Sequence, residues 1–79
     1  MKIRVKLFGT LKRHISGYDP VHGLEVEIPD GAKVKDLLSR LEIQQKETPI
    51  VTVNHRIVKT EEKLIDGSEV NLIQQVSGG

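Results

Sequence analysis

The residues best suited by type and position to take part in a reaction are the last two of the sequence, Gly78 and Gly79. At an average glycine usage of about 7%, two glycines in the final positions arise by chance in roughly 0.5% of chains. A C-terminal carboxylate has a reference pKa near ~3.5, so it is ionised at neutral pH and can attack the α-phosphate of ATP. Residues without a Cβ can also enter a narrow channel of a partner's active site. The alternative interpretation is a frayed terminus, which often contains glycine.

Side-chain chemistry is scarce elsewhere in the sequence. The chain has no cysteine, which excludes a disulfide framework, a thiolate zinc site and a cysteine nucleophile. The three histidines, His14, His22 and His55, stand apart from one another, so we expect no metal site. No serine lies in a nucleophile-elbow context and no glycine-rich loop could hold a phosphate. The sequence therefore does not indicate a self-sufficient enzyme.

Composition predicts one small soluble domain. The chain has 79 residues and a net charge of +1, which gives no electrostatic reason to expect a nucleic-acid or membrane partner. One Phe and one Tyr offer no stacking platform for bases. The basic face of the first predicted strand (Lys2, Arg4, Lys6) is expected to pair with Glu25 and Glu27. With no apolar stretch that suggests a signal peptide or membrane span, we expect a cytoplasmic protein.

Hydrophobic periodicity predicts five strands and one helix. Polar and apolar residues alternate over 2–8 and again over 24–28, as in half-buried strands. The spacing then changes to that of an amphipathic helix, with apolar residues at Val34, Leu37, Leu38 and Leu41. Three more strands are expected near 50–53, 57–58 and 70–72, with turns at Asn54-His55 and Asp66-Gly67.

These elements suit a single domain over residues 1–79 in the order β-β-α-β-β-β, with a flexible tail over residues 75–79. A hairpin, one helix and further strands favour an α+β fold, in which one main helix covers one face of a mixed sheet.

Two apolar residues break the strand alternation. Phe8 is in phase with the charged face of the first strand, and Ile73 is in phase with Asn71 rather than with the inward residues of the last strand. If these strands are neighbours, Phe8, Ile73 and Val76 form an apolar patch that leads to the tail. Such a patch suits partner docking, although single exposed apolar residues are also common without any role.

Five segments, in this order, carry a resemblance to a known family: Leu7-Phe8-Gly9, Val34-Lys35-Asp36-Leu37-Leu38, Val53-Asn54, Leu64-Ile65-Asp66-Gly67-Ser68-Glu69-Val70 and Val76-Ser77-Gly78-Gly79. Together they span nearly the whole chain. The set resembles the MoaD/ThiS sulfur-carrier proteins, which include the small subunit of molybdopterin synthase and the carrier of the thiamine pathway.

The resemblance implies a ubiquitin-like β-grasp fold and a carrier that is not itself an enzyme. Gly79 matches the residue that an E1-like adenylating enzyme (MoeB/ThiF type) activates with ATP. A sulfur donor protein or sulfide then converts it to a thiocarboxylate, and the carrier binds no cofactor stably. Partner-binding positions fall on Gly78, Ser77, Val76, Ile73 and Phe8. Ile73 departs from the aromatic residue that the family often has there.

Within the family, the sequence resembles the molybdopterin-synthase type more closely. Some fifteen residues separate Phe8 from Leu24, and Ser77 precedes the two glycines, as in that type. We therefore expect a role in molybdenum-cofactor biosynthesis with the molybdopterin synthase large subunit as partner. The alternatives are a carrier that serves thiazole synthase in thiamine biosynthesis, a ubiquitin-like protein modifier, and a β-grasp interaction or RNA-binding module with an idle tail.

Overall fold

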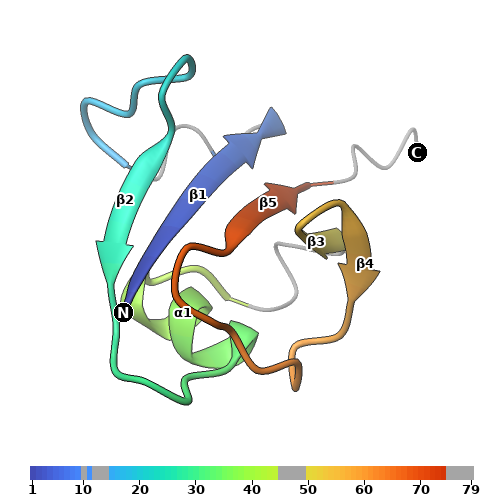
Figure 1. The fold of residues 1–79 in the computed structure, drawn as a ribbon. Helices are drawn as coiled ribbons and strands as arrows, with labels where there is room; N and C mark the ends of the chain where they lie inside the picture. Colours follow the sequence, from blue (N-terminus) through green and yellow to red (C-terminus); the bar gives the residue numbers. More distant parts are fainter. Residues whose placement is uncertain (10, 12–14, 45–49, 75–79) are drawn as a thin grey trace.

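The computed structural model shows a five-stranded sheet with one helix against one face (Figure 1). The structure describes residues 1–9, 11, 15–44 and 50–74. The elements follow the predicted order: β1 (Lys2–Phe8), β2 (Leu24–Glu27), α1 (Val34–Arg40), β3 (Ile50–Val53), β4 (Arg56–Val58) and β5 (Glu69–Ile73). The sequence pattern predicted this α+β arrangement, a mixed sheet covered by one helix, and it is the β-grasp fold that the family resemblance implied.

The first and last strands lie side by side in the middle of the sheet. The strand order is β2-β1-β5-β3-β4. β1 pairs with β5 in parallel, whereas the β1–β2, β3–β5 and β3–β4 pairs are antiparallel. Local sequence patterns predicted each strand but not this order, because the parallel pair joins segments at opposite ends of the chain.

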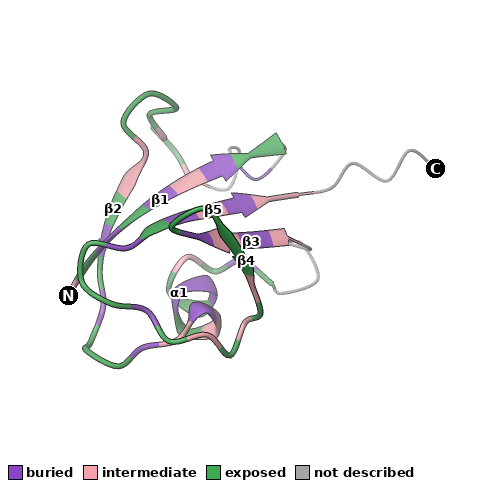
Figure 2. Ribbon diagram, turned by 45° about the vertical axis from the view of Figure 1, so that its right-hand side comes forward, coloured by how far each residue is buried: buried purple, intermediate pink, exposed green. Residues whose placement is uncertain are grey.

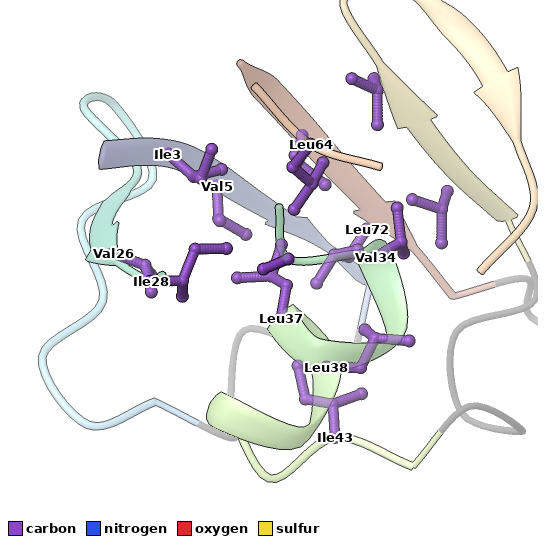
Figure 3. Close-up of a cluster of buried hydrophobic side chains, with 14 of the residues drawn as sticks. Ile3, Val5, Val26, Ile28, Val34, Leu37, Leu38, Ile43, Leu64 and Leu72 are labelled. Carbon is purple, nitrogen blue, oxygen red and sulfur yellow. The ribbon is translucent and has the colours of Figure 1, made fainter. Parts of the chain in front are cut away.

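The core lies between the sheet and α1 (Figures 2 and 3). Alternate residues of the two central strands point into it and are at most 1% exposed: Ile3, Val5, Leu7, Val70 and Leu72. Helix residues Val34, Leu37 and Leu38 close it from the other side, as the helical spacing predicted. Leu11, from the connection after β1, is also fully buried in this core.

Backbone groups at both ends of α1 have defined partners. At the start, the Asp36 carboxylate accepts the Lys33 N–H at 2.8 Å. At the end, Ile43 N–H donates to Leu38 O at 2.9 Å and Glu42 N–H to Ser39 O at 3.0 Å, the two bonds of a Schellman motif. The helix therefore stops at Arg40, one residue before Leu41, the last apolar residue of the predicted helical spacing.

The expected tight turn between β3 and β4 is the two-residue loop of a β-hairpin. Asn54 and His55 have φ values of 50° and 70°, and Val53 pairs with Arg56. Positive φ at both central residues is the geometry whose twist matches that of the flanking strands. The Asn54 side chain also accepts the Glu69 N–H at 2.9 Å, which ties the turn to β5.

A side chain from the connection between β1 and β2 accepts a backbone hydrogen bond from β1 beyond the end of β2. β2 pairs only as far as Val5, which leaves the Leu7 N–H beyond its end. The Tyr18 hydroxyl accepts that N–H at 2.8 Å. Gly23, at φ +77°, is required where the chain returns, since a Cβ there would lie 2.8 Å from the Val5 carbonyl oxygen.

Glu42 gives a testable prediction about stability. It occupies the left-handed position of the Schellman motif at φ 59°, which costs a residue with a Cβ roughly 1 kcal/mol. Glu42→Gly should therefore raise the free energy of unfolding in urea by about that amount. Glu42→Ala removes the same charge but keeps the Cβ, so equal stabilisation by both variants would contradict the backbone explanation.

Candidate functional site

The two apolar residues that break the strand alternation are direct neighbours on the outer face of the sheet. Phe8 pairs with Ile73 across the parallel β1–β5 pair, and Ile73 pairs with Ile50 across β3 and β5. Phe8 is 42% exposed, whereas Ile73 and Ile50 are half-buried. We call these three side chains the apolar row. It crosses three strands at the edge where β1 and β5 end.

Ile50 was missed in the sequence, although a signal was present. It is in phase with Thr52 and out of phase with the buried Val51 and Val53, as Ile73 is in phase with Asn71. The same test that singled out Ile73 would have found it. Val76, the third residue of the predicted patch, lies outside the described residues.

The segment that leads to the terminal glycines starts beside the apolar row. Gln74 follows Ile73 directly and is the last described residue. It packs against Gly9, where a Cβ would lie 3.2 Å from the Gln74 carbonyl oxygen and 3.6 Å from the Gln74 Cβ. The end of β1 therefore fixes where the chain leaves β5. Ser77, Gly78 and Gly79 lie outside the described residues, so their roles stay predictions.

The basic face of β1 is only partly neutralised. The Lys2 ammonium lies 3.5 Å from the Glu25 carboxylate, as the expected cross-strand pairing requires. The Arg4 guanidinium instead donates to the His22 carbonyl oxygen at 3.1 Å, although Arg4 and Glu25 are paired in register. Lys6 lies beside Asn71 of β5.

Two carboxyls in the described part of the chain have a clearly shifted pKa, and both are exposed groups beside a histidine or lysine side chain. A hydrogen bond from His22, with Nδ1 at 2.7 Å from Oδ2, lowers the pKa of Asp19, helped by two backbone N–H groups. A hydrogen bond from Lys35 lowers the pKa of Glu61. Neither carboxyl is poised to hold a proton near neutral pH, as a general acid must be.

The two histidines in the described part of the chain, His22 and His55, lie on different elements. His22 lies in the β1–β2 connection beside Asp19, and His55 lies on the β3–β4 turn. His14 lies outside the described residues. Among the residues that the structure describes, no three His, Asp or Glu side chains gather as a metal site would need. No helix in the described segments is long and apolar enough to cross a bilayer.

Several solved structures have the same fold as this chain. The chain is 29% identical to a protein assigned as molybdopterin converting factor subunit 1 from Pyrococcus furiosus, with a TM-score of 0.71 and coverage of 95% of this chain and 98% of that one. SAMP1 from Haloferax volcanii, a small archaeal modifier protein, has a TM-score of 0.74 at 21% identity, with full coverage of both chains. A comparison with curated proteins gave no significant match.

A third solved structure is a complex of subunits 1 and 2 of the molybdopterin-converting factor from Helicobacter pylori. It matches at a TM-score of 0.62 and 19% identity, again over the full length of both chains. The ThiS family model matches residues 5–79, which is nearly the whole chain. The solved structures that this chain resembles are ubiquitin-fold proteins of the MoaD/ThiS kind. The chain therefore belongs to the ThiS family of small sulfur-carrier proteins.

Proposed function

We propose that the protein carries sulfur on Gly79 for molybdopterin synthesis, as the small subunit of a molybdopterin synthase. The observation that carries the proposal is the side-by-side placement of Phe8 and Ile73, with Gln74 directly after them. A partner that holds the apolar row thereby also holds the origin of the segment that ends in Gly79. Membership of the ThiS family supports the sulfur-carrier chemistry proposed for that segment.

The proposed reaction needs no catalytic side chain from this protein. A carboxylate oxygen of Gly79 attacks the α-phosphorus of ATP in an E1-like adenylating enzyme (MoeB/ThiF type) and displaces pyrophosphate. Sulfide then attacks the carbonyl carbon and displaces AMP, which leaves a thiocarboxylate. If the outer sulfur of a donor protein's persulfide attacks instead, AMP is displaced and an acyl disulfide joins the carrier to the donor. With a persulfide donor, reduction of the sulfur–sulfur bond by a thiol completes the transfer.

The proposed partner in sulfur transfer is the large subunit of molybdopterin synthase, which would catalyse dithiolene formation with the sulfur carried on Gly79. Two resemblances support it: the subunit 1 protein of Pyrococcus furiosus, at 29% identity, and the fold shared with the subunit 1–subunit 2 complex of Helicobacter pylori. In such a complex the apolar row would face the large subunit, and residues Val76, Ser77 and Gly78 would lead Gly79 into its active site.

Two related functions remain as alternatives because they use the same activated terminus. Transfer of sulfur to thiazole synthase would serve thiamine biosynthesis, which suits the ThiS family match. Conjugation to lysine side chains would make the protein a ubiquitin-like modifier, which suits the fold shared with SAMP1. Co-purification with thiazole synthase would favour the first, and isopeptide-linked adducts the second.

The carrier chemistry predicts a specific mass change. After incubation with ATP, a sulfide source and the E1-like enzyme of the same organism, the intact protein should gain the difference between sulfur and oxygen. A variant that lacks Gly79 should show no gain under the same conditions. An enzyme shown to activate another carrier but giving neither an AMP adduct nor a sulfur gain here would contradict the proposal.

The Gly9–Gln74 contact predicts a separate effect on adenylation. Gly9→Ala and Gly17→Ala place a Cβ at nearly equal positive φ, +73° and +75°, so both cost stability by roughly 1–2 kcal/mol. Only the Cβ at position 9 meets Gln74, because position 17 faces open space. Gly9→Ala should therefore lower kcat for adenylation well below that of Gly17→Ala, since it displaces the tail's origin. Equal rates, measured by ATP–pyrophosphate exchange, would show that the contact has no role in presenting the tail.

A further inference from the structure

A polar hollow adjoins the apolar row on the outer face of the sheet. Its volume is about 160 Å³, and it is lined by Arg4, Lys6, Phe8, His55, Glu69 and Asn71, with the backbone of β5 beneath them. Phe8 belongs to both the hollow and the apolar row. The two features therefore form one continuous surface beside the origin of the tail.

The hollow exists because short side chains lie between longer ones. Asn71 of the central strand β5 is flanked in register by Lys6 of β1 and by Thr52 of β3. Lys6 and Phe8 form the wall on the β1 side. The β3–β4 turn supplies the other wall, because its φ values and its bond to Glu69 hold His55 over β5. Each wall is thus fixed by backbone pairing rather than by mobile loops.

The charge in this hollow is predominantly basic. Two cationic side chains, Arg4 and Lys6, line the hollow with a single carboxylate, Glu69. Lys2, one step further along the same face, is already paired with Glu25. Among the described residues, no carboxylate oxygen lies within 4 Å of the Lys6 ammonium. Lys6 as a whole residue is half-buried, whereas Lys2 is exposed.

We propose that the hollow receives a carboxylate of the activating enzyme, from a segment whose neighbouring apolar side chain packs on the apolar row. The inference rests on the proposed function and adds the chemistry by which the partner is recognised. A carboxylate would form a charge-assisted hydrogen bond with Lys6, and Asn71 can donate a second bond through its amide. Paired apolar and ionic contacts fix both the position and the orientation of the carrier, which directs the tail.

The test compares two charge reversals. Lys6→Glu places a negative charge in the hollow, and Lys59→Glu makes the same change at an exposed position outside it. Initial rates of ATP–pyrophosphate exchange are measured against carrier concentration for both. Lys6→Glu should raise the KM for the carrier by about tenfold or more with kcat nearly unchanged, because like charges then oppose docking. Lys59→Glu should change KM by less than about twofold.

Salt dependence separates the ionic contact from the apolar one. The wild-type KM should rise with ionic strength, because salt screens the Lys6–carboxylate attraction. Lys6→Gln keeps most of the side-chain volume and should flatten this dependence. Phe8→Ala should raise KM but leave the dependence on salt unchanged, since it removes packing alone. Thermal unfolding of each variant verifies that the carrier is folded at the assay temperature.

The outcomes distinguish this inference from the proposed function. Equal KM values for Lys6→Glu and Lys59→Glu, with normal exchange by the wild type, would overturn the inference and leave the function standing. A Lys6→Glu defect confined to complex formation with the large subunit would also overturn it, because the occupant would then be another partner. No exchange by the wild type, with an enzyme active on another carrier, would overturn both.

Discussion

The parallel pairing of β1 with β5 is the constraint on which the rest of the structure depends. Five residue pairs join these strands, from Arg4 with Glu69 to Phe8 with Ile73. The turn before β5 locks their register from one end: Lys2 N–H donates to the Asp66 carboxylate at 2.7 Å, and Gly67 N–H donates to Lys2 O at 2.8 Å. Because parallel strands need a crossover, the chain between β1 and β5 must cross one face of the sheet, and α1 lies on that face.

This pairing also explains why the candidate site lies where it does. Two parallel strands end at the same edge of the sheet, so the last residues of β1 and β5 meet there. The apolar row and the Gly9–Gln74 contact lie at that edge, and the basic hollow adjoins it at Phe8. The body therefore offers a rigid surface next to the origin of a segment whose terminal carboxylate is the proposed reacting group. Recognition and chemistry are assigned to different parts of a very small protein.

Much of the fold could be predicted from the sequence because its signals are local. Alternation of polar and apolar residues predicted β1 and β5, and the helical spacing of apolar residues predicted α1. The Asn54-His55 pair predicted the turn between β3 and β4. Strand order could not be derived this way, since it depends on pairing between distant segments. The end of α1 was also missed, because Glu42 occupies a left-handed position where glycine is the usual signal.

The candidate site was partly predictable for the same reason. Phe8 and Ile73 stood out as breaks in alternation, and their contact followed once the strands proved to be neighbours. The hollow left no trace in the sequence, because Lys6, Asn71 and His55 come from three separate elements. Its charge becomes informative only when the register shows which lysine lacks a cross-strand carboxylate.

The most direct test of the central claim changes the terminal carboxylate and nothing else. A semisynthetic protein with a carboxamide at Gly79 keeps every side chain, the apolar row and the hollow. ATP–pyrophosphate exchange by the E1-like enzyme should be abolished with the carboxamide, while the protein still competes with the wild type for the enzyme. Exchange at the wild-type rate with the carboxamide would show that Gly79 is not the group that reacts.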